Sequence, residues 1–433
     1  MKNLAITGGT PLREASNLNW PRADTADIEA VTEALRSPTW CRIKGHYAHT
    51  FEQEFATFQG AAYAVAVSSG TSALELGLLA LGINPGDEVI MSPYTFMASA
   101  TSVLVTRGVP VFVDIDPETY NIDPERIEEA ITDRTFALMP VHFGGRSCDM
   151  DAITEIARRH NLKVIEDASH AHGATWKEIG LGTIGDVGAF SLGSGKNLTA
   201  GEGGILLTNK EEIYWRAAEL HDLWTGGLVQ RSGEWGGGSF YSGSGWNFPQ
   251  AAPNYRLAEI LAALLSSRLK NLEPETQKRS DNGSYLNRLL AETAGVDPLT
   301  DDPRVTRNSY HIFIFKYREE AWGGLERELF VRALSAEGIP AFTGYSRGCH
   351  RDPLFTDVKG RKIWPYNRLL TDRVIDYATM VCPWVDKVCE NESIWLSGSF
   401  MLDGSREDME RVVHAIEKIR LHRDELNEVL SRG

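Results

Sequence analysis

The chain lacks the features that mark several large protein classes. Its 433 residues include only five cysteines, which are widely spaced and form no Cys-x-x-Cys pair, so neither a zinc site nor an iron–sulfur cluster is expected. The odd count and wide spacing are typical of reduced thiols in the cytoplasm. No apolar run has the length of a membrane span or of a signal peptide, and no repeat of fixed period occurs. We therefore expect a cytoplasmic protein without a membrane anchor or a metal centre.

Positive charge is scarce as well. The 44 lysines and arginines are outnumbered by 59 acidic residues, which gives a formal net charge of −15. Non-specific nucleic-acid binding needs a basic face, so this balance argues against a nucleic-acid partner. Hydrophobic residues make up 42% and charged residues 24% of the chain, as in globular proteins. The length suffices for two domains with sizeable cores.

What the sequence does contain is an alternation of strand and helix patterns from Tyr63 to Leu207. Such an alternation predicts βαβ units, and hence an α/β fold with a mostly parallel sheet covered by helices on both faces. Ligands bind beyond the carboxyl ends of the strands in these folds. Four candidate ligand-binding residues fall at such ends, namely Gly70, Phe96, Asp167 and Ser191. The periodicity therefore predicts one shared pocket.

The stretch from Lys163 to Thr208 carries the strongest chemical signal. Asp167 ends a buried strand, and Lys196 lies alone among small residues before a glycine-rich turn, Gly201-Glu202-Gly203-Gly204. Pyridoxal phosphate needs a lysine amine for its Schiff base and a carboxylate that keeps its pyridine nitrogen protonated. Taken alone, each residue is more often a solvated lysine or a strand-end cap. Together, in this frame, they favour a pyridoxal-phosphate site.

Three motifs in this stretch resemble the DegT–DnrJ sugar aminotransferase family, which belongs to the fold type I pyridoxal-phosphate enzymes. They are Glu166-Asp167-Ala168-Ser169-His170, Gly185-Asp186-Val187-Gly188-Ala189-Phe190-Ser191, and Gly195-Lys196-Asn197-Leu198-Thr199-Ala200-Gly201-Glu202-Gly203-Gly204. The resemblance extends from about Trp20 to the carboxyl end. It implies an arm at residues 1–20, a large cofactor-binding domain at 21–270, and a smaller C-terminal α+β domain at 271–433.

The resemblance also implies roles for single residues. Lys196 would form the Schiff base and move the proton, and Asp167 would face the pyridinium nitrogen. The other cofactor contacts implied are Gly70, Thr71 and Ser191 at the phosphate, Phe96 stacked on the ring, and His170 near the ring face or its 3-hydroxyl group. Each has a structural alternative, such as a plain helix cap at Gly70 and Thr71 or a core position for Phe96.

A further implication is a homodimer with shared active sites. Asn254 and Arg256 are expected to open a helix that runs to Leu269, and the family motif there reaches the partner's cofactor phosphate. The alternative is an ordinary helix start at an interface. A second helical segment, from Asn271 to Ala294, would link the two domains.

Several positions near the expected pocket have both a functional and a structural interpretation. Arg42 and Lys44 meet an anionic substrate group or are solvated, and His142 contacts substrate or makes a structural hydrogen bond. The glycine-rich loop from Gly226 to Gly245 covers the substrate or is a surface insertion. In the small domain we expect a strand over Tyr310–Phe315, a last strand over Ser397–Leu402, and a terminal helix over Ser405–Val429 with a Ser405/Asp408 cap.

The function that the resemblance implies is amino transfer from glutamate or glutamine to a small carbonyl acceptor. The run from Gly182 to Gly204 looks most like the branch that aminates keto-cyclitols such as scyllo-inosose, and it is also similar to the aminohydroxybenzoate synthase branch. Nucleotide-linked keto-sugars form the broader acceptor class, but a diphosphate calls for several cations at the mouth. The candidates for these cations are Arg42, Lys44, Arg347 and Arg351. Relatives that dehydrate a sugar replace the lysine with histidine, and a non-catalytic regulatory protein is the other alternative; Lys196 argues against both.

Overall fold

The structure is a computed structural model, and it describes residues 3–14, 20–221, 253–357 and 375–430. Within the final helix, side chains are described as far as Leu426. The loop from Gly226 to Gly245, for which a substrate-covering role was one interpretation, lies outside the described residues.

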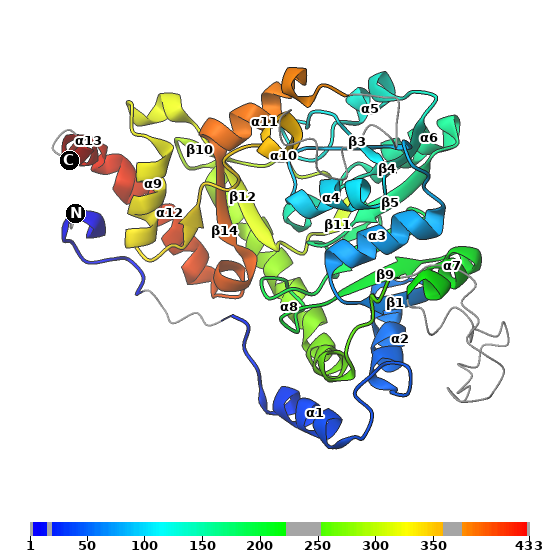
Figure 1. Cartoon of the computed structure of the whole chain (residues 1–433). Helices are drawn as coiled ribbons and strands as arrows, with labels where there is room; N and C mark the ends of the chain where they lie inside the picture. Colours follow the sequence, from blue (N-terminus) through cyan, green and yellow to red (C-terminus); the bar gives the residue numbers. More distant parts are fainter. Residues whose placement is uncertain (1–2, 15–19, 222–252, 358–374, 431–433) are drawn as a thin grey trace, which may run out of the picture.

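A seven-stranded sheet forms the centre of the large domain (Figure 1). Its strands follow the order β1-β9-β8-β5-β4-β2-β3. All pairs from β8 to β3 are parallel, whereas β9 runs antiparallel to both of its neighbours. The strands are β1 (Tyr63–Val67), β2 (Glu88–Met91), β3 (Val109–Phe112), β4 (Thr135–Met139), β5 (Lys163–Asp167), β8 (Val187–Ser191) and β9 (Gly204–Thr208). The predicted mostly parallel sheet is confirmed.

Helices cover both faces of this sheet because its strands bury both sets of alternating side chains. In β1, Ala64 and Ala66 join one apolar cluster, whereas Val65 and Val67 join another on the opposite face. The first cluster includes residues of α2 and α6, and the second includes residues of α3, α4 and α7. The helices are α1 (Thr25–Arg36), α2 (Tyr47–Gln59), α3 (Gly70–Leu81), α4 (Met97–Val105), α5 (Pro124–Ala130), α6 (Met150–His160) and α7 (Glu211–His221), with the short η2 (Phe143–Gly145).

The small domain is built on a four-stranded antiparallel sheet with the order β10-β12-β14-β13. A separate apolar cluster joins this sheet to α9 and α12. The strands are β10 (Val296–Pro298), β12 (Ile312–Tyr317), β13 (Ala341–Phe342) and β14 (Ser393–Ser397). The helices are α9 (Arg327–Ala336), α10 (Pro353–Thr356), α11 (Pro383–Lys387), α12 (Arg406–Leu421) and α13 (Arg423–Leu430), with the short η3 (Glu319–Trp322), η4 (Cys349–Arg351), η6 (Tyr377–Thr379), η7 (Val388–Glu392) and η8 (Gly398–Leu402).

Two connections link the large domain to the small domain. Helix α8 (Glu259–Ala291) runs between the two sheets (Figure 1), and its leucines join the core of the large domain at one end and that of the small domain at the other. A small sheet pairs β11 (Val305–Arg307) with β6 (Thr175–Trp176), which in turn pairs with β7 (Ile179–Gly180).

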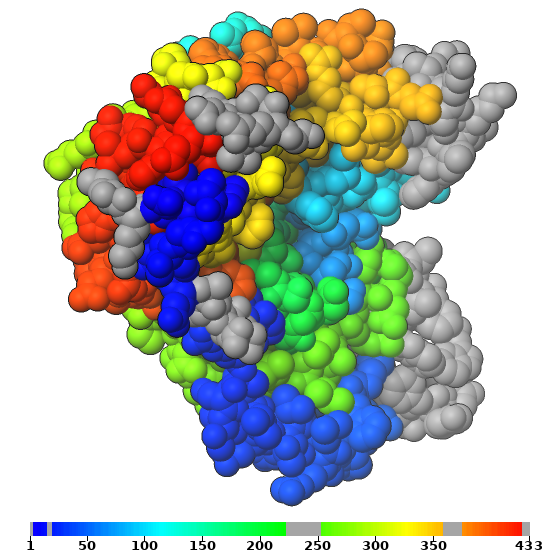
Figure 2. Space-filling view, turned by 90° about the vertical axis from the view of Figure 1, so that its left-hand side faces the viewer, coloured from blue at the N-terminus to red at the C-terminus, as the bar shows by residue number. Residues whose placement is uncertain are grey.

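The amino-terminal segment packs on the small domain. Leu4 is fully buried in the small-domain core next to η1 (Ala5–Thr7), and the Ala5 N–H donates to the Glu337 carboxylate at 2.8 Å. The Lys418 ammonium donates to the Thr10 carbonyl at 3.2 Å. Figure 2 shows this blue segment lying on the red C-terminal helices. The expected arm is thus anchored at its start.

Three predicted element boundaries are wrong, and the strand expected over Tyr310–Phe315 is shifted by two residues, to Ile312–Tyr317. The last strand spans Ser393–Ser397 instead of Ser397–Leu402, because a side chain at Gly398 would lie 1.6 Å from the Tyr310 carbonyl oxygen and the chain turns there into η8. The terminal helix starts at the predicted Ser405/Asp408 capping box but breaks at His422.

The third wrong boundary concerns α8. This helix begins at Glu259 rather than Asn254 and continues through the expected break near residue 270. Its start is fixed by the Glu259 carboxylate, which accepts hydrogen bonds from the N–H groups of Tyr47 and Ala48 at 2.7 and 3.1 Å. The preceding residues are extended instead, and Arg256 pairs with Val67 of β1.

Candidate active site

The carboxyl ends of β1, β2, β5 and β8 meet at one edge of the large sheet, because these four strands run in the same direction. We call this the carboxyl edge. Strand β9 is antiparallel and begins at Gly204, opposite Ser191. The loop of residues 192–203, which contains Lys196, therefore lies at the same edge as Asp167.

The first turn of α3 and the end of β8 form a tight cradle. Ser69 caps the helix by accepting the Ser72 N–H, so the first turn presents backbone N–H groups at the carboxyl edge. A side chain at Gly70 would lie 2.6 Å from the Ser191 Cβ atom, so only glycine allows this approach. His172 Nε2 donates to the Ser191 carbonyl at 2.9 Å. A helix start beside a hydroxyl is well suited to a phosphate group, and Thr71 follows in the same turn.

Asp167 is buried at the end of β5, and neutral donors hold its carboxylate. The Ser99 hydroxyl donates to Oδ2 at 2.7 Å, and the Ser169 N–H donates to Oδ1 at 3.1 Å. Ser99 lies in the first turn of α4, and Thr95 contacts its hydroxyl at 2.8 Å. The carboxylate is thus fixed in orientation by an uncharged hydroxyl and a backbone N–H group.

Lys196 is half-buried in its loop, where its own N–H donates to the Gly193 carbonyl at 2.9 Å. Burial lowers the pKa of the Lys196 amine to about 8, and the nearby Asp167 carboxylate opposes this shift. The effect of Asp167 places the two groups within electrostatic reach of each other. An amine with this pKa is about half neutral at pH 8 and can act as a base there.

His170 is buried in the turn that follows Asp167. Its Nδ1 accepts the Gly144 N–H at 3.2 Å, so in the neutral ring the proton is on Nε2. Burial and the Lys196 charge hold the pKa of His170 well below its usual value, which keeps the ring neutral. The ring of His311, which directly precedes β12, lies 4.3 Å away between centroids.

The remaining predicted cofactor residues are found at different places. Phe96 follows β2 at the carboxyl edge and is 63% exposed, so the alternative of a core position is wrong. Asn254 and Arg256 lie in the extended segment along the outer edge of β1, where the Tyr255 carbonyl accepts the Ser68 N–H at 2.7 Å.

Two of the ambiguous positions prove to be structural. Arg42 is buried and pairs with Glu52 at 2.7 Å. Burial would raise the pKa of Glu52, but Arg42 and His49 lower it to about 2. His142 is buried as well; its Nε2 donates to the Glu166 carboxylate at 3.0 Å, and its Nδ1 accepts the Cys148 N–H at 3.2 Å. The structural alternative for His142 is thus confirmed.

Sequence reasoning missed several residues of the site: Ser99, His172, Asn197, Ser309 and His311. Ser99 lies three positions after Phe96, in the first turn of α4, and this closeness to a predicted site residue is a signal that the sequence does offer. Ser309 and His311 come from the small domain, and no local pattern shows that they reach the lysine loop.

The residues present fit pyridoxal phosphate. The carboxyl edge combines a glycine cradle at a helix start, a fixed buried carboxylate and a lysine of lowered pKa, which are the groups this cofactor requires. Among the described residues, no group of three or more His, Cys, Asp or Glu side chains is arranged to hold a metal ion. No helix in the described ranges has the length and apolar character needed to cross a membrane.

Comparison with known proteins identifies the chain. The DegT/DnrJ/EryC1/StrS aminotransferase family matches residues 21–381. The chain belongs to this family. It is 37% identical to a protein of Streptoalloteichus tenebrarius, across 98% of this chain and 99% of that protein, which is provisionally assigned as an L-glutamine:3-amino-2,3-dideoxy-scyllo-inosose aminotransferase. It is 33% identical to the 3-amino-5-hydroxybenzoate synthase of Amycolatopsis mediterranei, across 90% and 93% of the two chains.

Solved structures agree with this assignment. The crystal structure of 3-amino-5-hydroxybenzoic acid synthase superposes with a TM-score of 0.79 at 32% identity, covering 94% of this chain and 98% of the other. The chain is therefore a pyridoxal-phosphate-dependent aminotransferase of fold type I. The predicted family, fold class, activity and cofactor are confirmed.

Proposed function

We propose that this aminotransferase moves an amino group from glutamine or glutamate to a keto-cyclitol or related keto-sugar, with Lys196 as its catalytic base and Asp167 as the partner of the pyridine nitrogen. One observation carries the assignment of the two residues. Lys196 and Asp167 lie within electrostatic reach at the carboxyl edge, where burial lowers the pKa of the amine to about 8. The donor and the acceptor are inferred from the names of the relatives.

The chemistry divides between the cofactor and the chain. When bound, the cofactor supplies an electron sink for the bond that breaks at the substrate carbon. Asp167, oriented by Ser99, keeps the proton on the pyridine nitrogen. Lys196, as a neutral amine, would take the proton from the substrate carbon and deliver it to the cofactor carbon at which the amino group is then held.

The other residues bind and orient. Gly70, Thr71 and Ser191 bind the phosphate at the start of α3, where the helix dipole favours an anion. Phe96 presents an exposed ring for stacking. The Nε2 proton of His170 is free to donate to an oxygen substituent of the cofactor ring, because Nδ1 is the acceptor for Gly144.

The charges at the mouth favour an acceptor without a diphosphate. Of the four cations that a nucleotide group was expected to need, Arg42 pairs with Glu52 and Arg351 pairs with Asp386 at 2.8 Å. An aminohydroxybenzoate synthase-like activity stays the second candidate, because that enzyme is among the similar relatives and solved structures.

A screen of acceptors separates these candidates. The pyridoxamine form of the enzyme is mixed with scyllo-inosose-type ketones, nucleotide keto-sugars or an aminohydroxybenzoate precursor ketone, and return of the pyridoxal absorbance is followed. We expect keto-cyclitols to react fastest. Faster reaction of a nucleotide keto-sugar would contradict the proposed acceptor while leaving the aminotransferase activity in place.

We also propose a homodimer in which Asn254 and Arg256 serve the partner's phosphate. Exposed apolar side chains on and after α1 support an interface, with Ile28 at 60%, Leu35 at 48% and Trp40 at 58% exposure. Lys196→Ala and the double variant Asn254→Ala, Arg256→Ala are each expected to be inactive. Co-expressed, they form about half mixed dimers, each with one intact site, so activity returns to roughly a quarter of wild type. No recovery in verified mixed dimers would place the whole site within one chain.

The proposed domain boundary near residues 270 and 271 lies inside α8, so the two domains share one helix. Separate apolar clusters on either side support the division. All five cysteines are free thiols in the structure, as expected for a cytoplasmic enzyme.

A further inference from the structure

The residues on the two sides of Lys196 differ in burial. Ser194 and Gly195 are exposed, and Lys196 is held locally by a single turn to Gly193. The next three residues, Asn197, Leu198 and Thr199, are each 1% exposed, and Asn197 directly follows the lysine. Consecutive Cα atoms are about 3.8 Å apart, so whatever holds Asn197 also sets the position of Lys196.

Both ends of the Asn197 amide bond to the small domain. The Nδ2 group donates to the Ser309 carbonyl at 3.0 Å, and Oδ1 accepts the Ser399 hydroxyl at 3.3 Å. Ser309 lies shortly before β12, and Ser399 lies in η8, which follows β14. The lysine loop of the large domain is therefore tied to two separate segments of the small domain through one side chain.

Ser309 continues this chain of contacts to the other side of the site. Its hydroxyl donates to the His170 carbonyl at 2.7 Å, and its N–H donates to the Gly145 carbonyl at 3.1 Å. Gly145 has a φ of +87°, and a side chain there would lie 2.3 Å from the Ser309 hydroxyl, so the approach is very close. His170 follows Asp167 by three residues. Ser309 thus joins the lysine loop to the turn that follows Asp167.

We propose that Asn197 is a positioning residue: by binding Ser309 it fixes the Lys196 amine relative to the Asp167 carboxylate, so that docking of the small domain sets the geometry of the reacting groups. This inference rests on the proposed roles of Lys196 and Asp167. A displacement of about 1 Å from a residue outside the chemistry can reduce a rate by roughly 100-fold. The contacts of Asn197 are well placed to prevent such a displacement.

The test uses the holoenzyme and two variants. Asn197→Ala removes both bonds, and Asn197→Asp keeps the acceptor for Ser399 but turns a carboxylate oxygen toward the Ser309 carbonyl. We expect both to lower kcat by roughly 100-fold with little change in the KM of the amino donor, because the lost interaction acts on the chemical step. We also expect a shift in the pH midpoint of the visible absorbance of cofactor bound to Lys196, which needs no turnover.

Asn282 offers a matched control. It is also a buried asparagine, and its Nδ2 donates to the carbonyls of Leu402 and Gly404 at 2.7 and 3.1 Å, which links α8 to the end of η8 and to the turn that follows it. Asn282→Ala removes a comparable pair of bonds away from the lysine loop. It should lower stability, yet leave kcat and the pH midpoint of the absorbance unchanged.

The outcomes separate this inference from the proposed function. Borohydride reduction and peptide mapping of the wild type come first, and attachment to another lysine would overturn the role of Lys196 itself. If the cofactor is on Lys196 and the Asn197 variants keep both the wild-type kcat and the pH midpoint, the positioning role is wrong and the function stands. If Asn197→Ala does not fold, Asn197→Asp decides in its place, because it keeps the size of the side chain but removes the donor to the Ser309 carbonyl; an unchanged kcat and midpoint there would also overturn the inference.

Discussion

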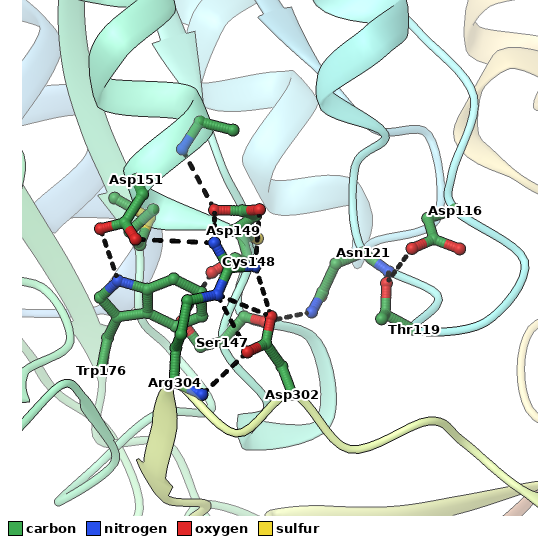
Figure 3. Close-up of polar contacts among 12 residues, drawn as sticks. Asp116, Thr119, Asn121, Ser147, Cys148, Asp149, Asp151, Trp176, Asp302 and Arg304 are labelled. Atoms are coloured by element: carbon green, nitrogen blue, oxygen red, sulfur yellow. Dashed lines mark hydrogen bonds and ion pairs between the residues drawn. The ribbon is translucent and has the colours of Figure 1, made fainter.

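The molecule contains two clusters of charged side chains that behave in opposite ways. In the first, the Arg304 guanidinium contacts the carboxylates of Asp302 at 2.6 Å and Asp149 at 2.8 Å, and it lies over the ring of Trp176 at 4.6 Å (Figure 3). Asp151 closes the cluster by accepting the Trp176 Nε1–H at 3.1 Å and pairing with Lys177 at 2.5 Å. These bonds lower the pKa of Asp302 and raise that of Arg304, so each charge is held.

The second cluster is the carboxyl edge of the active site. There the hydrogen bonds to Asp167 come from a neutral hydroxyl and a backbone N–H, and burial lowers the pKa of the Lys196 amine. In the Arg304 cluster, direct ion pairs affect the pKa values more than burial does, and the charges form a fixed network. At the carboxyl edge, burial affects the pKa of Lys196 more than the Asp167 carboxylate does, and the amine is reactive. The comparison predicts that changes at Lys196 and Asp167 affect catalysis, whereas changes near Arg304 affect stability.

The largest effect is expected for Lys196→Ala. Loss of the base alone removes roughly 10²–10⁴-fold in rate, and the visible absorbance of lysine-bound cofactor should disappear as well. Lys177→Ala in the Arg304 cluster is the matched control, and it should keep the wild-type rate and the visible absorbance. Retained absorbance in the Lys196 variant, with borohydride labelling of another residue, would show that the lysine is misassigned.

Asp167→Asn should have the next largest effect. The side chain keeps its size but loses the anion that retains the pyridine proton, so half-transamination should slow by roughly 10²–10³-fold while cofactor stays bound through its phosphate. Single-turnover spectroscopy measures this rate. Asp151→Asn, which removes a carboxylate from the Arg304 cluster, should leave it unchanged. A near wild-type rate in Asp167→Asn would mean that another group faces the nitrogen.

The sequence predicted the residues of the carboxyl edge because strand ends and motif spacing are local signals. The predicted alternation of strands and helices begins with β1 at Tyr63 and ends with β9 at Gly204–Thr208, because alternating or continuous apolar runs bounded by turns define these strands. Asp167 was found because it ends a buried strand, and Lys196 was found because it precedes a glycine-rich turn. The resemblance assigned Phe96 to the cofactor ring, and the 63% exposure of its side chain excludes the alternative of a core position.

What the sequence could not show are contacts between distant segments. Arg42 resembles a solvated or substrate-binding cation until Glu52 is seen beside it. Asn197 looks like a small loop residue, although its partner Ser309 lies 112 positions away. The turn at Gly398 was missed for the same reason, because the obstacle there is the carbonyl of Tyr310, which lies 88 positions earlier and just before β12.

The pH dependence of Lys196 sharpens the comparison. In enzyme freed of cofactor, the amine is charged below about pH 8 and neutral above it, whereas an ordinary lysine loses its proton near pH 10.4. At pH 8 about half of the Lys196 amines are then neutral, a fraction roughly 100-fold higher than for an ordinary lysine. The rate of labelling by an amine reagent, followed by peptide mapping, should rise with a midpoint near pH 8. Because Asp167 opposes the shift, Asp167→Asn should move that midpoint lower; an unchanged midpoint would mean that the two groups do not interact.

The smallest effect on activity is expected at Arg304. Arg304→Met keeps an apolar stem over Trp176 but removes the guanidinium, which leaves three carboxylates close together without it. The Arg304 side chain is 37% exposed, so water screens part of the loss, and we expect a decrease of about 1–2 kcal/mol in the free energy of unfolding. The free energy of unfolding of Arg304→Lys should fall between those of the wild type and Arg304→Met, because an ammonium keeps the charge but lacks the planar fork that reaches two carboxylates at once. Denaturant titration measures the difference, which should shrink in high salt, while kcat stays at the wild-type value. If Arg304→Met instead slows half-transamination as much as Asp167→Asn does, the two clusters are coupled and the division between a stabilising and a reactive set of charges is wrong.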